Sequence, residues 1–348
     1  MKRIISLLLI LCLLLSGCSF AQHPTTQAPT AGADSSLQVH FLDVGQADCA
    51  LLECGGKYML IDGGNVADSS LVVSYLQKIG VAELEAVVCS HAHEDHVGGL
   101  PGVLAVFPTK AVYAPTNTYS SKVFDDFLYY ADQQRLEVTI PSPGDRIDFA
   151  DASVTVLGPT KSYADPNNTS IVLMVQFGQT KFLFTGDMET EAEGDMLEYW
   201  GEHFDWHADV LKVGHHGSET STGYRFVRSV MPDYAIISVG EGNTYGHPHE
   251  APLSRLEQAG VAQYRTDKLG TVIAVSDGMA VQFTWESAST APQNPTVPAP
   301  TEFIGNKNSK TLHLPTCTSL PKEENRVVFD DYDEAIAQGY KPCGKCME

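Results

Sequence analysis

The densest group of side chains able to do chemistry lies at residues 90–100, which read SHAHEDHVGGL. His91, His93, Asp95 and His96 follow an apolar run at 86–89 that is typical of a buried strand. Burying such groups without partners is costly, whereas imidazole and carboxylate are common ligands of zinc, iron and manganese. The H-x-H-x-D-H spacing therefore predicts a metal site on a tight loop at the end of a strand, and not a solvated polar loop.

Further potential ligands follow three later strand-like segments. The run KFLFTGD at 181–187 places Asp187 at the end of a strand. The strand expected over 209–213 runs into GHHGS at 214–218, which supplies His215 and His216. A strand over 234–239 precedes a turn that carries His247 beside a proline. We expect these turns to meet the first loop along one edge of the fold.

The elements that must position these residues begin at residue 37. Strands are expected over 37–42 and 49–53, the second turning at Gly55-Gly56 into a third strand that ends at Asp62. The apolar period at 69–79, closed by Gly80, predicts a helix, and 119–134 is typical of a surface helix whose aromatics pack inward.

The metal loop resembles that of the metallo-β-lactamase superfamily, and the strand, turn, strand and Asp62-Gly63-Gly64 resemble the start of its first sheet. The string DVGQAD at 43–48 more narrowly resembles the soluble metallo-hydrolase domain of the ComEC competence family, as do GHHGS and the Gly-His-Pro around His247. The chain departs from that family at Ala47, where Gly is usual, and at His93, where Asp is frequent.

This resemblance implies an α/β fold, the αββα metallo-β-lactamase sandwich of two mixed sheets with helices outside, over residues 37–286. It also implies two divalent metal ions, zinc or manganese, with Asp187 bridging them and Asp62 orienting a ligand. The first ion would bind His91, His93 and Asp187. The second would bind Asp95, His96, Asp187 and one of His215 and His216, of which we favour His215. Asp95, Asp187 and His247 are the expected catalytic residues, with His247 acting as a ligand or a general acid.

A third histidine motif of lactamase-type sites has no counterpart here, because no histidine lies between His96 and His203. The turn Asn167-Asn168-Thr169-Ser170 occupies the place, and Asn168 is predicted to be a weak ligand or a substrate contact. The candidate phosphate contacts are Lys212, Thr169, Ser170 and Ser218.

The N-terminus predicts an exported lipoprotein. Lys2-Arg3 precedes a short apolar run over 4–15, which matches a signal peptide and is too short to span a bilayer. The sequence Leu15-Ser16-Gly17-Cys18 resembles a lipobox, so residues 1–17 would be removed and Cys18 lipidated, anchoring the protein at the outer face of the cell membrane. A plain secretory signal is the alternative. Residues 18–36 are predicted to be a flexible tether.

A separate module is predicted after a proline-rich linker at 287–301. Residues 302–348 offer three sulfurs and one imidazole, the complement of a closed tetrahedral zinc site: His313, Cys317, Cys343 and Cys346. The module resembles the zinc-binding domain of the Ada DNA-repair protein, with His313 where Ada has Cys. So short a segment needs a metal to fold, and we expect it to be independent of the body. Disulfides are the competing state.

Composition limits the substrate. The 348 residues are 43% hydrophobic and carry a formal net charge of −21, so the surface should repel nucleic acid on average. The combined prediction is a surface-anchored hydrolase of phosphodiesters that uses two metals to lower the pKa of a bound water, with extracellular DNA as the implied substrate. The alternatives are a hydrolase of small or lipid-like phosphoesters such as phosphorylcholine esters, a β-lactamase, and a non-catalytic DNA-binding lipoprotein. No protein partner is predicted.

Overall fold

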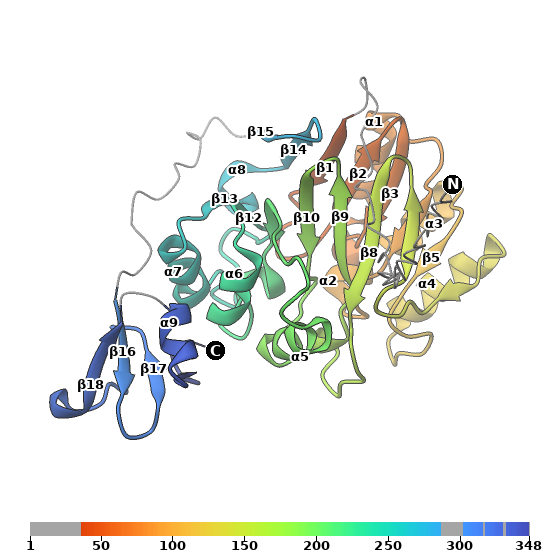
Figure 1. Ribbon diagram of the computed structural model, residues 1–348. Helices are drawn as coiled ribbons and strands as arrows, with labels where there is room; N and C mark the ends of the chain where they lie inside the picture. Colours follow the sequence, from red (N-terminus) through yellow and green to blue (C-terminus); the bar gives the residue numbers. More distant parts are fainter. Residues whose placement is uncertain (1–35, 287–301, 316, 330–331, 348) are drawn as a thin grey trace, which may run out of the picture.

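Two mixed sheets packed face to face form the body of the protein (Figure 1). The computed structural model describes residues 36–286, 302–315, 317–329 and 332–347. The predicted signal peptide, Cys18, nearly all of the tether and the linker lie outside the described residues. Within the described ranges, no helix is long and apolar enough to cross a membrane.

The first sheet has eight strands and the second has seven. In spatial order the first contains β15 (Val281–Trp285), β14 (Val272–Ser276), β1 (Leu37–Phe41), β2 (Ala50–Cys54), β3 (Lys57–Ile61), β4 (Ala86–Val88), β5 (Val112–Tyr113) and β6 (Val138–Thr139). The second contains β13 (Ala262–Arg265), β12 (Tyr234–Ile237), β11 (Val210–Lys212), β10 (Thr180–Phe184), β9 (Val172–Phe177), β8 (Ala152–Gly158) and β7 (Arg146–Phe149).

Helices cover the outer face of each sheet. The first sheet is covered by α1 (Ser69–Ile79), α3 (Leu100–Val106) and α4 (Lys122–Gln133), and the second by α5 (Thr190–Trp200), α6 (Tyr224–Val230) and α7 (Glu250–Gln258). The short helices of the body are η1 (Val66–Asp68), α2 (Glu94–Val97), η2 (Asn167–Thr169), η3 (Gly214–Gly217) and α8 (Thr266–Leu269). This is the αββα sandwich expected from the sequence.

Three apolar layers follow from the alternation of side chains along the strands. In β2, Leu52 points into the core between the sheets, whereas Leu51 points to the helices outside. Phe41 and Phe184 stack across the inner core with ring centroids 5.9 Å apart. Strands covered on both faces therefore read as continuous apolar runs.

The predicted helices match their patterns closely. Helix α1 ends at Gly80, which adopts the left-handed conformation (φ 89°) that glycine tolerates. Helix α4 begins after Ser121, whose hydroxyl accepts the Phe124 N–H, and it buries Phe124 and Phe127. These aromatics pack in the core as expected and offer no substrate surface.

Strand direction collects the candidate site residues. Strands β3, β4 and β5 are parallel to one another, as are β10, β11 and β12. The carboxyl ends of parallel strands lie at one edge of a sheet. The loops that follow β3, β4, β10, β11 and β12 therefore meet where the edges of the two sheets come together.

The C-terminal segment folds as an α+β module with its own four-stranded sheet. In spatial order the strands are β18 (Arg326–Phe329), β16 (Phe303–Asn306), β17 (Thr311–His313) and β19 (Lys341–Pro342), accompanied by η4 (Glu323–Asn325) and α9 (Tyr332–Ala337). Its apolar core includes Phe303 and Tyr340, and also Tyr224 from α6 of the body.

This contact corrects the expectation that the module is independent of the body. The Tyr224 ring lies 6.3 Å from Phe303 and 5.9 Å from Tyr332, and the Arg228 guanidinium lies 4.6 Å from the Tyr332 ring centre. Tyr224 is only 4% exposed, so the module covers an aromatic patch on α6.

Candidate metal centre

The metal loop is held in place by Asp62. This carboxylate accepts the Ser90 N–H and the Ser90 hydroxyl, each at 2.7 Å, and lies 2.8 Å from His96 Nδ1. Asp62 adopts a left-handed backbone conformation (φ 59°), which is strained for a residue other than glycine and is characteristic of functional sites. Because Nδ1 is engaged by Asp62, Nε2 of His96 is left to face the site, as expected for an oriented metal ligand.

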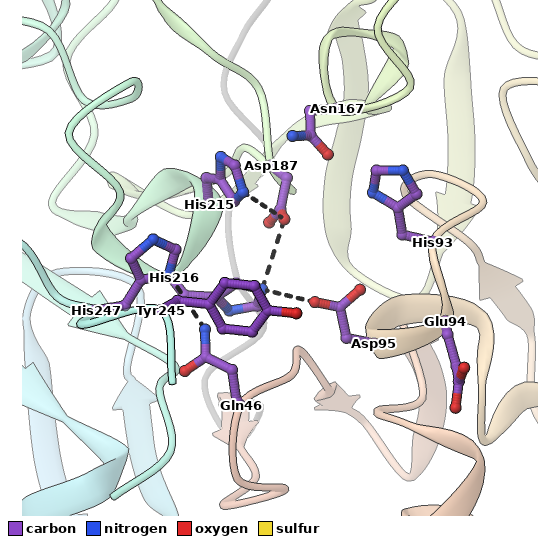
Figure 2. Close-up of a pocket in the computed structure, with 10 residues that line it drawn as sticks. All are labelled: Gln46, His93, Glu94, Asp95, Asn167, Asp187, His215, His216, Tyr245 and His247. Carbon is purple, nitrogen blue, oxygen red and sulfur yellow. Dashed lines mark hydrogen bonds and ion pairs between the residues drawn. The ribbon is translucent and has the colours of Figure 1, made fainter. Parts of the chain in front are cut away.

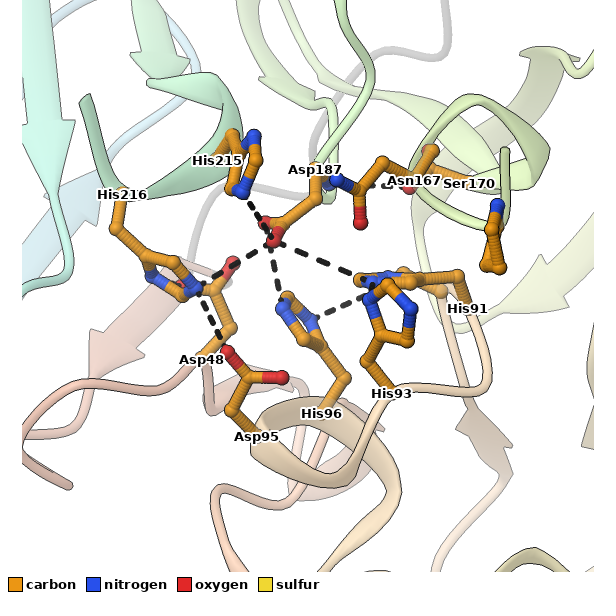
Figure 3. A network of polar contacts seen from close by, with 12 residues as sticks. Asp48, His91, His93, Asp95, His96, Asn167, Ser170, Asp187, His215 and His216 are labelled. Atoms are coloured by element: carbon orange, nitrogen blue, oxygen red, sulfur yellow. Dashed lines mark hydrogen bonds and ion pairs between the residues drawn. The ribbon is translucent and has the colours of Figure 1, made fainter. Parts of the chain in front are cut away.

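Asp187 lies at the centre of a ring of imidazoles (Figure 3). One oxygen, Oδ1, is 3.2 Å from His96 Nε2. The other, Oδ2, is 3.5 Å from His216 Nε2, 3.9 Å from His215 Nε2 and 4.0 Å from His91 Nε2. A buried carboxylate with imidazoles around both of its oxygens is well placed to serve as a metal ligand.

One group of four residues has the composition of a metal site. The ligand atoms of Asp95, His96, Asp187 and His216 all lie within 4.8 Å of one another. His216 Nε2 is 3.3 Å from Asp95 Oδ2 as well as 3.5 Å from Asp187. These are the residues expected for the second metal, provided that the histidine is His216.

The structure reverses our preference for His215. Both histidines have left-handed backbone angles (φ 50° and 53°), and this strained turn brings both imidazoles to Asp187. His216 is buried within the group of four, whereas His215 is partly exposed and its Nδ1 lies 3.3 Å from Glu189. The sequence position after Gly214 does not reveal which imidazole is buried in the group of four.

Asp48 is a site residue that the sequence analysis missed. His216 Nδ1 donates to the Ser238 carbonyl (3.0 Å) and lies 3.2 Å from Asp48 Oδ1, which leaves Nε2 toward the site. The other oxygen of Asp48 is 2.7 Å from Lys212 Nζ. Its position at the end of the DVGQAD string was the available signal, but only the fold shows that this carboxylate reaches His216.

The same ion pair corrects the prediction for Lys212. This lysine is 4% exposed, pairs with Asp48 and donates to the Val213 carbonyl at 2.8 Å. Its ammonium group is therefore a buried counterion and cannot contact a phosphate in the cleft.

The histidines expected at the first metal are less tightly grouped. His91 Nε2 lies 3.0 Å from His93 Nδ1 and 4.0 Å from Asp187. Among the described residues, these three do not form a second group as compact as that of His216. The three residues therefore lie near one another, but their ligand atoms are not all within 4.8 Å, as those of the His216 group are.

Asn167, and not Asn168, faces this part of the site. The Asn168 side-chain oxygen accepts the Glu189 N–H at 2.9 Å, so Asn168 supports the backbone next to Asp187. Asn167 lines the cleft, and its buried Oδ1 has no hydrogen-bond partner among the described residues.

The hydroxyl groups proposed as phosphate contacts are also engaged elsewhere. Thr169 donates to the Pro166 carbonyl at 2.6 Å, and Ser170 donates to the Asn167 carbonyl while accepting the Asp187 N–H. Ser218 is buried and shares a hydrogen bond with Thr220. They shape the loops around the site and do not face the cleft.

The cleft above the metal ligands has a volume of about 340 Å³ (Figure 2). Besides the candidate ligands, it is lined by Gln46, Glu94, Asn167, Tyr245 and His247. Among the described residues, no lysine or arginine lines the cleft. An anionic substrate would therefore be held by cations bound at the centre and by neutral donors.

His247 lines the cleft as expected, with its orientation fixed by Gln46. Gln46 Oε1 accepts the Gly240 N–H, so its amide nitrogen donates to His247 Nδ1 at 3.2 Å. The ring proton of neutral His247 is therefore on Nε2. Burial and the neighbouring His216 and His215 lower the pKa of His247 to about 4. A neutral imidazole near pH 7 suits a hydrogen-bond donor better than a general acid, which was one of the two roles we expected beside that of a ligand.

The charges in the group favour cation binding. Burial would lower the pKa of His216, but Asp187 and Asp48 raise it to about 10. Burial would likewise lower the pKa of His96, which Asp187 and Asp62 hold well above its usual value. Without metal these carboxylates are neutralised by protons on imidazoles, and a metal ion would displace those protons on binding.

Buried polar atoms without hydrogen bonds are a second sign that these side chains fit a metal ion. His96 Nε2 and Asp187 Oδ1 are 3.2 Å apart and buried, yet neither makes a hydrogen bond of good geometry. His216 Nε2 is also buried without such a bond. Buried polar atoms are rarely left unpaired in folded proteins. Atoms that crowd together without bonding one another are expected where they share a cation.

The four predicted zinc ligands of the module also come together. The ligand atoms of His313, Cys317, Cys343 and Cys346 lie within 4.8 Å of one another, and the three cysteines are free thiols. The Leu314 N–H donates to Cys346 Sγ at 3.4 Å. The group has the composition of a closed structural zinc site.

Comparison with protein families gives two matches. Residues 42–241 match the family described as the metallo-beta-lactamase superfamily, and residues 299–348 match the metal binding domain of Ada. The first match spans more than half of the chain and contains the candidate ligands of the cleft from His91 to His216. The second contains the four ligands of the module.

Individual relatives include competence proteins. ComE operon protein 3 of Bacillus subtilis (strain 168) is 30% identical over 257 residues, which cover 68% of this chain and 33% of that protein. Competence protein ComA of Neisseria gonorrhoeae is 32% identical over 246 residues, covering 70% and 33%. The chain thus spans about a third of the length of these relatives. Among solved structures, the metallo-beta-lactamase fold protein YhfI from Bacillus subtilis is 12% identical, with a TM-score of 0.48, covering 70% of this chain and 100% of that chain.

Proposed function

Because the chain belongs to the metallo-beta-lactamase superfamily, we propose that it is a metal-dependent hydrolase of phosphodiesters, with DNA as its substrate. The observation that carries this proposal is the position of Asp187, whose carboxylate lies within 4.0 Å of four imidazoles. The relative named as competence protein ComA supports a nucleic-acid substrate.

The residues for binding two ions are present. Asp95, His96, Asp187 and His216 would hold one ion, and His91, His93 and Asp187 would hold the other, with the Asn167 oxygen available beside it. Two divalent cations at these positions, zinc or manganese, would supply a nucleophilic water at neutral pH and positive charge to face the phosphate.

The chain's own residues would bind and orient the substrate. His247, protonated on Nε2, would donate a hydrogen bond to a phosphate oxygen, and Gln46 would keep it in that tautomer. Asp62 and Asp48 would hold His96 and His216 in place. Such carboxylate–imidazole contacts orient metal-binding rings and increase their basicity.

Two further parts of the proposal concern the N-terminal and C-terminal segments. We propose that lipidation at Cys18 anchors the protein at the outer face of the cell membrane, where it would meet extracellular DNA. The module at 302–348 would hold one structural zinc and cover α6. Mass spectrometry of the mature N-terminus from the native host tests the anchor, and an unmodified Cys18 would contradict it.

A hydrolase assay tests the activity. Protein loaded with Mn²⁺ or Zn²⁺ is incubated with plasmid DNA, bis(p-nitrophenyl) phosphate, p-nitrophenyl phosphate and a chromogenic β-lactam, with Asp187→Ala as the inactive control. We expect cleavage of the plasmid and the diester and little turnover of the monoester. Turnover of the β-lactam alone would refute the proposal, and inactivity toward every substrate with metals bound would favour a non-catalytic role.

A second candidate function is hydrolysis of small or lipid-like phosphoesters. Among the described residues, the lining of the cleft contains no lysine or arginine, and it includes the acidic Glu94 and Asp95. Such a lining suits a headgroup that is positively charged. Faster turnover of p-nitrophenyl phosphorylcholine than of any nucleic acid would select this function.

A further inference from the structure

Tyr245 is a large aromatic residue exposed at the entrance of the cleft. Its side chain is 68% exposed, and it lines the same cleft as Asp187 (Figure 2). Its ring lies nearly parallel to that of His247, with centroids 5.7 Å apart and an interplanar angle of 24°. One face of Tyr245 is thus supported by His247, and the residue contributes little to the protein core.

The turn that carries both rings is braced by Asn243. The side-chain oxygen of Asn243 accepts the N–H groups of Tyr245 and His247 at 3.1 and 3.0 Å. Its amide nitrogen donates to the carbonyls of Gly240 and His247 at 3.0 and 2.6 Å. Gln46 fixes the His247 ring from the opposite side. The pair of rings is therefore positioned before a ligand arrives, which lowers the entropic cost of binding.

Other exposed tyrosines of this protein differ in their surroundings. Tyr129 on α4 and Tyr199 on α5 are 55% and 58% exposed, and each packs against the aromatic neighbour that follows it in sequence. Neither lines the metal cleft. Exposure alone is thus not distinctive, whereas exposure combined with a stacked partner at the metal centre is.

We propose that Tyr245 is a stacking surface for a nucleobase of single-stranded nucleic acid whose phosphodiester lies at the metal centre. This inference rests on the proposed function and specifies its substrate. A paired base in a duplex cannot offer its face to a side chain, whereas an unpaired base stacks readily on tyrosine. Stacking needs no cationic residue, so it suits a cleft without lysine or arginine.

A quaternary ammonium headgroup is the other ligand that an aromatic ring can bind. Such cations are recognised by cages, in which several ring faces surround the charge. Tyr245 and His247 are nearly parallel, so together they offer a single outer face. A flat surface fits a flat ring, and the geometry favours the nucleobase.

The test compares oligonucleotides with and without bases. Single-stranded 8-mers, either fully based or carrying abasic residues throughout, are hydrolysed by wild type, Y245A and Y245F, with Y129A as the matched control. We expect the wild type to show about a 10-fold lower KM for the based strand, a difference that Y245A loses and that Y245F and Y129A keep. The kcat values should change little, because Tyr245 is not expected to touch the reacting atoms.

A binding measurement separates the two proposals. An oligonucleotide containing 2-aminopurine should lose fluorescence on stacking against wild-type protein and lose less with Y245A. If Y245A retains both the KM difference and the quenching, the stacking proposal is refuted although hydrolysis stands. If no strand is hydrolysed but quenching depends on Tyr245, the proposed activity fails and the binding site remains. If Y245A impairs turnover of p-nitrophenyl phosphorylcholine more than that of the oligonucleotide, the ligand is the quaternary ammonium group.

Discussion

Asp48 pairs with the buried Lys212 and also contacts His216. Variants of this ion pair can therefore distinguish an effect on stability from an effect on metal binding. Both side chains are at most 7% exposed, and Nζ lies 2.7 Å from Oδ2. At an effective dielectric constant near 20, the attraction at this distance is about 6 kcal/mol before desolvation. Asp48→Asn keeps the shape of the side chain but leaves the lysine charge buried, with the Val213 carbonyl as its remaining partner.

We expect D48N to lower the free energy of unfolding by about 3 kcal/mol, the lower end of the range for breaking a buried pair, because Lys212 retains one hydrogen bond. The affinity for a metal ion at His216 should fall about 10-fold, since Nδ1 loses a carboxylate but keeps the Ser238 carbonyl. The double variant D48N/K212M removes both charges. It should recover most of the stability and none of the affinity.

Stability is measured by urea unfolding. Metal affinity is measured by titrating Mn²⁺ into protein whose module already contains zinc. Thiolate ligands disfavour Mn²⁺, so the titration reports binding in the cleft and not in the module. K110M breaks the exposed pair with Glu85 (2.7 Å) and serves as the control, with no change expected in the unfolding midpoint. A double variant no more stable than D48N would refute the ion-pair argument. Unchanged Mn²⁺ affinity in D48N would refute the role of Asp48 in orienting His216.

Four further predictions follow from the same geometry. Asp187→Ala should abolish hydrolysis and lower the bound active-site metal by at least one ion with the fold retained, as checked by metal analysis and circular dichroism; a variant with two metals and normal turnover would contradict the bridging role. Cys343→Ser should release one zinc, unfold the module and uncover Tyr224, lowering the melting temperature of the body, whereas unchanged melting would show that the α6 contact contributes nothing. Burial raises the pKa of Glu193 from 4.5 to about 7 even though two backbone N–H groups donate to its carboxylate. Between pH 4.5 and about 7, Glu193 therefore holds a proton in the folded protein that it has lost in the unfolded chain. Stability should therefore fall as pH rises through this window, by at most about 3 kcal/mol, and Glu193→Gln should remove that dependence in urea unfolding at pH 5 and 8. Affinity for single-stranded DNA should depend only weakly on salt, because few phosphates would meet lysine or arginine; a fall equivalent to six or more contacts would indicate a basic groove elsewhere.

Local patterns in the sequence predicted the strands, the helices and the candidate ligands, and the superfamily that the motifs resemble predicted how they assemble in the body. The H-x-H-x-D-H loop, the Gly-Asp end of β10 and the paired histidines after β11 each follow an apolar run, and the structure brings them to one edge. Helix α1 could be placed because its apolar period and closing Gly80 are adjacent in the chain. The ligands of the module were evident from their residue types and spacing, because a closed zinc site allows few other combinations.

Tertiary structure alone decided the contacts between distant segments. The choice of His216 over His215 depends on two left-handed residues in a turn, and nothing in the residue types fixes which imidazole joins the buried group of Asp95, His96 and Asp187. Asn167 faces the cleft because its neighbour Asn168 is engaged with the Glu189 backbone, across 21 positions of sequence. The module contacts the body because Tyr224 of α6 completes its apolar core.

Asp48 and Lys212 show most clearly that contacts between distant segments cannot be predicted from local sequence. Asp48 follows β1 in the first sheet and Lys212 ends β11 in the second, so their contact exists only once the two sheets pack against each other. A lysine near a metal site suggests phosphate binding when read from sequence, because exposure is then unknown. Residue types and spacing determined the chemistry that this protein can carry, whereas the packing of the two sheets determined which groups face the cleft and which are buried as counterions.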